Sequence, residues 1–141
     1  MNKIKHLKLS PFSRQLFKEW DTLAYIINSF QLRLEFNERE IWSCYLGMNV
    51  GDEQMGTNED FLRPVIILKK FNSKVCWAIP LTRTDKKSVH YFPFNFITGT
   101  QSVAILSQLR LIDSKRLKTM IGKMKNGDFI KLKEKLTALL S

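Results

Sequence analysis

A series of short apolar segments in the middle of the chain constrains the fold more than any other feature. Each segment is rich in β-branched or aromatic residues, and turns bearing Gly, Asn or Lys separate them, which is typical of β-strands. The segments are Ile41 to Leu46, Pro64 to Lys69, Val75 to Leu81, Val89 to Phe96 and Ser102 to Leu106. Short strands in close succession predict a small β-barrel of five to six strands.

Helical periodicity flanks the predicted strands on both sides. Ser10 and Pro11 suit the N-cap and the first position of a helix, and the apolar spacing from Phe12 to Phe36 predicts one long amphipathic helix. A short helical piece is predicted from Asp113 to Gly122, and a last helix follows a cap at Asn126 to Asp128. The fold class is therefore α+β. The apolar stripe of the first helix consists of Leu16, Trp20, Leu23, Ile27, Phe30 and Leu34.

Length and charge limit the class of partner. The 141 residues suit a single compact core. The 23 Lys and Arg residues exceed the 13 Asp and Glu residues, and the net charge of +10 attracts polyanions such as nucleic acid or an acidic protein. The Lys123 to Lys135 group also fits a merely solubilising helix face, so this group alone decides nothing.

Several classes of protein are excluded. The longest apolar stretches are too short for a membrane span, and residues 1–10 do not form a secretory signal. Cys44 and Cys76 lie inside apolar runs with no spaced partner, which predicts buried thiols and neither a disulfide framework nor a zinc site. We therefore expect a cytoplasmic protein with no membrane association.

The chemistry is narrowed by the residues the chain lacks. His6 and His90 are the only histidines, and no phosphate-binding Gly-rich motif is present, so neither a metal nor another cofactor is expected. Arg, Lys, Thr, Ser, Glu and Gln remain. Such groups can promote phosphodiester transfer in RNA, because the 2′-hydroxyl of RNA supplies the nucleophile and fixed donors stabilise the phosphorane charge.

One connection is unusually long. The polar segment Gly47 to Leu62 joins the first two predicted strands, and loops of this length in compact domains are usually functional or disordered. It contains Gly51 to Gln54 and a second acidic pair, Glu59 and Asp60, shortly before Arg63. We expect a mobile flap over a site.

The motifs resemble those of the PemK/MazF family of toxins from bacterial toxin–antitoxin systems. The resemblance covers about residues 40 to 140, in order. It is carried by Glu40 to Trp42, Gly51 to Gln54, Arg63 to Ile67, Ile79 to Thr82, Ser102 to Leu117, and Ile121 with Gly122. It implies an SH3-like barrel and divides the chain into an N-terminal helical extension, residues 1–38, and a toxin-like domain, residues 39–141.

The resemblance also implies a function. Members are metal-independent, sequence-specific endoribonucleases, or mRNA interferases, that cut single-stranded RNA to leave 2′,3′-cyclic phosphate and 5′-hydroxyl ends. The implied partners are the RNA substrate, a cognate antitoxin protein and a second copy in a homodimer. Operator DNA is an implied partner only together with the antitoxin.

Site residues are carried over by motif. Arg63 is the main catalytic candidate, as stabiliser of the phosphorane, and Thr82 would hold the scissile phosphate. Glu53 is a further catalytic candidate; it and Gln54 resemble groups that contact RNA or relay a proton, and the resemblance assigns no general base. The RNA-binding candidates are Gln54, Arg83 and Gln108; Arg83 stands where many members have Ser or Thr, and it would alter or add a phosphate contact.

Each candidate has a plainer interpretation. Arg63 would simply open a strand and pair with Asp60, Thr82 would be an ordinary strand end, and Glu53 would be an exposed loop charge. Four aromatic residues could stack on bases or belong to the core. They are Trp42, Trp77, Tyr91 and Phe94.

Departures from the family pattern leave two questions open. Ile105 and Ser107 occupy places where one branch of the family relies on an Arg and an Asp, so the catalytic proposal of that branch does not transfer. Nothing in the resemblance explains the Phe12 to Phe36 helix, which would bury its stripe against its own barrel, a dimer mate or the groove for an antitoxin. Two other functions compete: a non-enzymatic poison like CcdB, which blocks DNA gyrase, and a nucleic-acid-binding repressor subunit.

Overall fold

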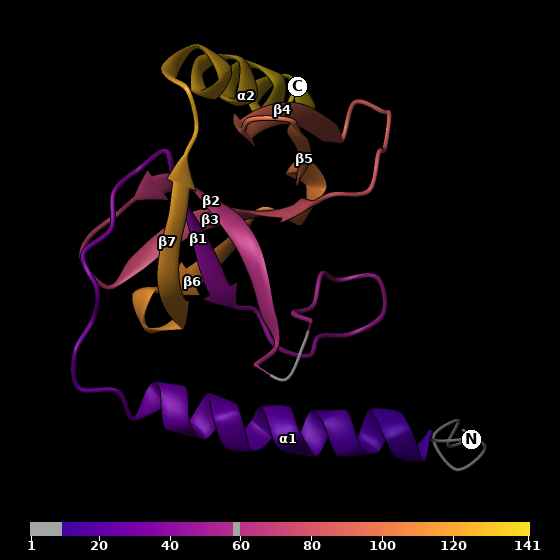
Figure 1. Ribbon diagram of the computed structural model, residues 1–141, viewed down its shortest axis with the longest axis vertical. Helices are drawn as coiled ribbons and strands as arrows, with labels where there is room; N and C mark the ends of the chain where they lie inside the picture. Colours follow the sequence, from indigo (N-terminus) through magenta and orange to yellow (C-terminus); the bar gives the residue numbers. More distant parts are fainter. Residues whose placement is uncertain (1–9, 58–59) are drawn as a thin grey trace.

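The computed structural model describes residues 10–57 and 60–141 and has α+β architecture, as predicted. Helix α1 (Pro11–Asn28) lies along one end of a curled sheet, and α2 (Asn126–Leu139) covers the other end (Figure 1). The strands between them are β1 (Glu40–Tyr45), β2 (Leu62–Lys70), β3 (Val75–Thr82), β4 (Tyr91–Ile97), β5 (Thr100–Ile105), β6 (Arg110–Asp113) and β7 (Leu117–Lys123). Single 3-10 turns, η2 (Leu106–Gln108) and η3 (Ser114–Arg116), flank β6.

The sheet is antiparallel and curls because β3 serves two neighbours along one edge. The order is β4-β5-β3-β2-β1-β7, and β6 also pairs with β3. The first half of β3, from Val75 to Ala78, pairs with β6, whereas Leu81 and Thr82 pair with β5. The predicted barrel-like sheet is therefore confirmed, with seven strands instead of five or six.

Both faces of the central strands are buried. Alternate residues of β2 point to opposite faces, so Ile66 and Leu68 pack toward α2 while Val65 and Ile67 pack toward β6 and β7. Phe36 closes the second of these cores and is almost fully buried. A fully buried side chain of this size contributes about 1.5–3 kcal/mol relative to an exposed one, so the sheet holds most of the stability.

The predicted first helix is too long. The cap is confirmed, since the Ser10 hydroxyl accepts a hydrogen bond from the Ser13 amide at 3.3 Å, but α1 ends at Asn28 instead of Phe36. The chain then runs without regular structure so that Phe36 reaches the core of the sheet. Burial of one aromatic side chain in the sheet thus outweighs continuation of the helical stripe, and Leu34 is left exposed.

The segment Asp113 to Gly122 is a second correction, because most of it forms a strand. Residues Leu117–Lys123 are β7, which pairs with the otherwise free edge of β1. The helical signal is limited to η3, where the Asp113 carboxylate caps the Lys115 amide at 2.8 Å. Backbone pairing with β1 satisfies the amides of this segment, which overrides its apolar spacing.

The last helix begins where expected but is capped differently. Asn126 is its first residue, and Lys125 takes the N-cap position without a side-chain hydrogen bond, so the predicted side-chain cap is wrong. Asp128 lies in the first turn, where its negative charge suits the helix dipole. In the part of the chain that the structure describes, no helix has the length and apolarity to span a membrane.

Candidate functional site

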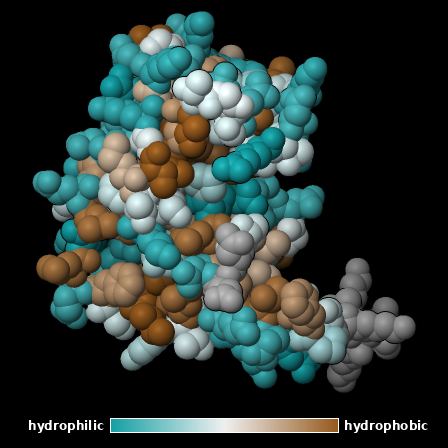
Figure 2. Space-filling model, in the orientation of Figure 1, coloured by the Kyte–Doolittle hydropathy of each residue, from teal (hydrophilic) through white to brown (hydrophobic). Residues whose placement is uncertain are grey.

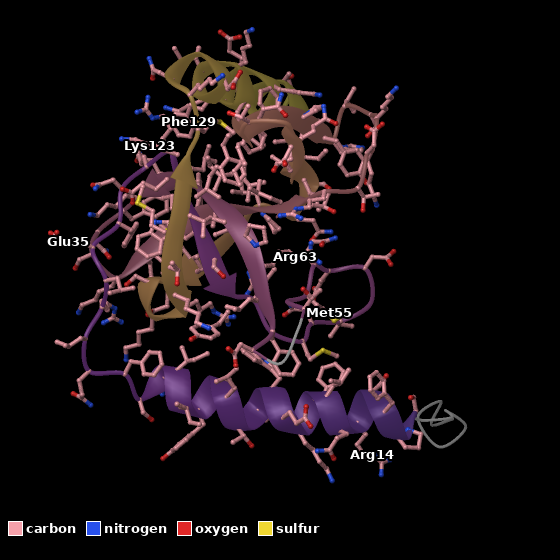
Figure 3. All side chains as sticks on the ribbon, in the orientation of Figure 1. Arg14, Glu35, Met55, Arg63, Lys123 and Phe129 are labelled. Atoms are coloured by element: carbon pink, nitrogen blue, oxygen red, sulfur yellow. The ribbon has the colours of Figure 1, made fainter. Side chains whose placement is uncertain are left out.

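Arg63 lies near the start of β2, beneath the loop that connects β1 to β2; its described residues, 46–57, 60 and 61, are hereafter the β1–β2 loop. Its Nε donates a hydrogen bond to the Met55 carbonyl at 2.6 Å, and its Nη1 donates to the Leu81 carbonyl at 3.1 Å (Figure 3). The side chain is half-buried, and this burial lowers the pKa of Arg63, although a guanidinium remains charged at neutral pH. Asp60 forms its ion pair with Lys118 at 3.0 Å, which contradicts the plainer interpretation that Asp60 pairs with Arg63.

Thr82, on β3, lies opposite Arg63 on the neighbouring strand β2. Val65 pairs with Pro80, so the antiparallel register brings Arg63 opposite Thr82, and opposed residues share one face of the sheet. The Thr82 hydroxyl accepts a hydrogen bond from the Thr84 amide at 3.2 Å. Thr82 and Arg83 line a separate hollow of about 70 Å³. Arg63 and Thr82 therefore lie opposite each other on neighbouring strands, but their side chains line different hollows.

The β1–β2 loop folds on itself instead of extending away. The Asn49 side-chain amide donates to the Gln54 carbonyl at 2.6 Å, and the Glu53 carboxylate accepts from the Val50 amide at 3.0 Å. The loop lies over Arg63, as expected of a flap, and its mobility stays a prediction. Glu59 of the second acidic pair lies outside the described residues.

Gln108 fastens the tip of this loop to η2. Its Nε2 donates to the Asp52 carbonyl at 3.1 Å, and its Oε1 accepts from the Gln54 amide at 3.4 Å. Arg63 holds the same tip from below through Met55. Three motifs that are distant in sequence therefore converge on one loop.

Two polar hollows adjoin at this loop. One, of about 320 Å³, is lined by residues 51–57 and Arg63. The other, of about 450 Å³, lies between the loop and η2. Glu53 and Gln54 line both hollows, so we treat them as one feature, the loop groove. The larger hollow is lined by Asn49, Glu53, Gln54, Pro80, Ser107, Gln108, Leu109 and Arg110.

The structure gathers four of the six predicted site residues in the loop groove: Arg63, Glu53, Gln54 and Gln108. Thr82 and Arg83 lie beyond it. Sequence reasoning missed Asn49 and Arg110. Arg110 stands two residues after Gln108 in the same motif, which could have indicated it, whereas nothing local distinguishes Asn49.

The groove carries charges of both signs. Arg63 and Arg110 contribute two positive charges, and Asp52 and Glu53 contribute two negative ones. Within residues 10–57 and 60–141, no group of three or more His, Cys, Asp and Glu side chains could hold a metal ion. Planar guanidinium groups bind two phosphate oxygens at once, so the arrangement can bind and stabilise a phosphodiester.

The remaining predicted residues lie mostly in the core. Trp42 and Phe94 are buried, whereas Trp77 is exposed and Tyr91 is half-buried. The Lys86 ammonium lies 5.6 Å from the centre of the Tyr91 ring. Cys44 and Cys76 are free buried thiols, as predicted, and burial raises the pKa of each to about 12.

Comparison with family models identifies one family. A family model described as "PemK-like, MazF-like toxin of type II toxin-antitoxin system" matches residues 37–140. No curated protein sequence matches the chain.

Solved structures share the fold at low sequence identity. MazF from Deinococcus radiodurans is 18% identical with a TM-score of 0.63, and the match covers 76% of this chain and 97% of that one. The Mycobacterium tuberculosis toxin MazF-mt6 is 20% identical with a TM-score of 0.56, covering 72% and 96%. An endoribonuclease from Mycobacterial species, solved in complex with its cognate antitoxin, is 13% identical with a TM-score of 0.59, covering 75% and 95%.

Proposed function

Because the chain belongs to the PemK-like and MazF-like toxins of type II toxin–antitoxin systems, we propose that it is a metal-independent endoribonuclease that cuts single-stranded RNA at short specific sequences. The position of Arg63 carries the proposal. Its half-buried guanidinium lines a polar groove that also contains the side-chain amides of Asn49, Gln54 and Gln108. A fixed, partly desolvated cation stabilises a phosphorane more strongly than a cation in bulk water.

The reaction needs no cofactor to balance. The RNA 2′-oxygen attacks the adjacent phosphorus, the O2′–P bond forms and the P–O5′ bond breaks. The products are a 2′,3′-cyclic phosphate and a 5′-hydroxyl. The 2′-hydroxyl proton passes to Glu53, directly or through water, and the leaving 5′-oxygen takes a proton from Arg63 or from water. No redox change occurs and no water is consumed, because proton exchange with solvent removes the proton from Glu53 and replaces the one given to the 5′-oxygen.

The protein's part is binding and orientation. Arg63 would hold the two non-bridging oxygens with its planar fork. Thr82 lines a separate hollow, so its side chain would have to turn toward Arg63 to donate its hydroxyl to the same phosphate. Gln54 and Gln108 would bind the flanking nucleotides, and Arg83 would add a phosphate contact at the Thr82 hollow. The Met55 carbonyl occupies Nε of Arg63, so the β1–β2 loop must yield for a phosphate to bind the guanidinium through Nε as well as through Nη2.

The proposed partners follow from the same family. We propose that a cognate antitoxin neutralises the toxin, that the toxin forms a homodimer, and that it meets operator DNA only together with the antitoxin. Support comes from the antitoxin-bound mycobacterial endoribonuclease of the same fold and from the net charge of +10, which suits acidic partners.

The test is RNA cleavage by the purified protein in excess EDTA. We expect cleavage of single-stranded RNA at a limited set of sites, with 2′,3′-cyclic phosphate ends identified by mass spectrometry. Dependence on added magnesium, or 5′-phosphate products, would contradict the mechanism. Growth inhibition by a protein that leaves RNA intact would favour the non-enzymatic poison.

A further inference from the structure

Helix α1 packs against the β1–β2 loop, and Trp20 is the most extensive of its described contacts with the two ends of that loop. Trp20 packs against Gly47 so closely that a Cβ on Gly47 would lie 2.2 Å from Cε2 of the indole. The Trp20 ring also meets the Phe61 ring, with centroids 5.7 Å apart. Gly47 and Phe61 are joined to each other, because the Leu46 and Gly47 amides both donate to the Phe61 carbonyl, at 3.0 and 3.2 Å. Trp20 therefore covers both ends of the β1–β2 loop, which we call the loop neck.

Arg116 holds the neck from a second side. Its Nη1 donates to the Tyr45 carbonyl at 3.0 Å and to the Leu46 carbonyl at 3.3 Å. Its guanidinium lies 5.7 Å from the Trp20 ring, close enough for a cation–π interaction. The indole and the guanidinium thus support each other while both fix the neck.

The backbone of the neck requires this support. Gly47 has a φ of 81°, and Phe61 has a φ of 54°, in the left-handed region that costs a residue with a side chain about 1–2 kcal/mol. Such a conformation persists only when its surroundings determine it. The Phe61 ring is buried in one cluster with Trp20 and Ile27 of α1, so α1 supplies part of those surroundings.

We propose that Trp20 is a positioning residue, which together with Arg116 holds the loop neck so that the β1–β2 loop stays closed over Arg63. The proposal rests on the proposed function where it concerns RNA. When α1 loosens, the two neck residues relax, the Arg63–Met55 hydrogen bond breaks more often, and phosphate gains access to the guanidinium. Loosening is therefore expected to lower KM for RNA severalfold and to leave kcat nearly unchanged.

The direct test is hydrogen exchange of the full chain, read at the backbone amides of residues 49–57. Trp20→Ala should exchange at these amides about tenfold faster than the wild type, corresponding to a loss of ~1.4 kcal/mol in local stability. Amides of β2 and β3 should keep the wild-type rate. Phe17→Ala is the matched control, since Phe17 is an aromatic residue of the same helix, is partly exposed and lies outside the Trp20 cluster.

Labelling of Arg63 gives an independent readout. A dicarbonyl reagent selective for arginine, followed by mass spectrometry of the Arg63 peptide, should modify Arg63 severalfold faster in Trp20→Ala and Arg116→Gln. Trp20→Phe, which keeps an aromatic face, should restore most of the protection. If Trp20→Ala does not fold, Arg116→Gln is judged by the same criteria, and Trp20→Phe is still expected to stay close to the wild type.

The outcomes separate the two proposals. Wild-type exchange and labelling in every folded neck variant, or acceleration equal throughout the protein, would overturn the neck proposal. Faster loop exchange and labelling without any RNA cleavage by the wild type would leave the neck proposal standing and overturn the proposed function. Faster exchange and labelling with unchanged KM would overturn the link between the loop and RNA access.

Discussion

Strand β2 and helix α1 both carry apolar stripes, yet they are buried to very different degrees. Val65, Ile66 and Ile67 in β2 have no exposed surface, because both faces of the strand are covered. In α1 only Trp20 and Ile27 are buried, and its outer side chains face solvent (Figure 2). An apolar stripe therefore shows which side chains an element can bury, and the elements packed against it determine how much of their surface is buried.

This difference in burial suggests different roles for the two elements: β2 stabilises the fold, and α1 affects the β1–β2 loop. The sheet carries the core, so its residues open only with global unfolding, whereas an element held by a few contacts opens at lower free energy. α1 is of the second kind, and its contacts are with the loop neck and with η3. The comparison predicts large effects on folding from the sheet, and smaller, local effects from α1.

The largest effect on stability is expected in the sheet. Ile66→Ala removes a fully buried side chain between β2 and α2, and the resulting cavity should cost about 2–5 kcal/mol in the free energy of unfolding. Chemical denaturation measures the loss. If Ile66→Ala lowers the free energy of unfolding less than Ile27→Ala in α1 does, the sheet is not the main source of stability.

Removal of α1 should cost less. A chain that begins at residue 31 lacks the buried Trp20 and Ile27 but keeps Phe36 in the core and Arg33 at its ion pair. We expect the free energy of unfolding to fall by about 1–3 kcal/mol, because the entropy of ordering the helix offsets much of its burial. Cleavage should persist at the same RNA sites. Loss of cleavage, or cleavage at new sites, would place α1 in the RNA groove.

Two glycines with nearly equal φ angles provide a finer comparison. Gly47 and Gly99 have φ angles of 81° and 80°, but a Cβ would meet the Trp20 indole at Gly47 and nothing within 4 Å at Gly99. Gly99→Ala should therefore lower the free energy of unfolding by about 1 kcal/mol, because alanine disfavours the positive φ. Gly47→Ala should cost about 1 kcal/mol more, because the indole must move. Equal melting temperatures would mean that Trp20 leaves the neck at little cost.

The smallest effect concerns the segment after α1. Arg33 binds Asp113 at 3.0 Å. Partial burial opposes ionisation of the Asp113 carboxyl, but the Lys115 amide and the Arg33 guanidinium outweigh it and lower its pKa. The ion pair therefore stabilises the fold above the unfolded pKa of about 4 and ceases to do so as pH falls through the lower folded pKa.

Asp113→Asn tests this ion pair, because Asn can still cap the Lys115 amide. Both partners are partly exposed, so the loss at neutral pH should be under ~1 kcal/mol. The difference from the wild type should shrink as pH falls below about 4. Thermal unfolding across pH measures it, and a difference independent of pH would exclude the ion pair as its cause.

The sequence predicted elements whose local and tertiary preferences agree. The strands from Ile41 to Leu106 were found because β-branched runs and turn residues point to the same answer. β7 was missed because the spacing of Leu117, Met120 and Ile121 fits a helix, and only the free edge of β1 makes it a strand. The end of α1 was missed because the burial of Phe36 in the core of the sheet depends on distant segments and leaves no signal in the local sequence.

The site was predictable in its residues and less so in its geometry. Motif order indicated Arg63, Glu53, Gln54 and Gln108, and these four converge on the loop groove. That Arg63 donates to Met55 and that Gln108 holds Asp52 and Gln54 depends on how the loop folds back, which sequence spacing does not define. The role of Trp20 depends on contacts between segments that are distant in the chain.

The most direct measurement is the rate of RNA cleavage by Arg63→Ala in EDTA, beside the wild type and Arg14→Ala. Arg14 is exposed on α1 and far from the groove, so it controls for loss of one positive charge (Figure 3). The account predicts a loss on the order of 10²-fold or more for Arg63→Ala, as when a key oxyanion donor is removed, near-normal melting, and a wild-type rate for Arg14→Ala. A wild-type rate for Arg63→Ala, or an equal loss in both variants, would contradict it.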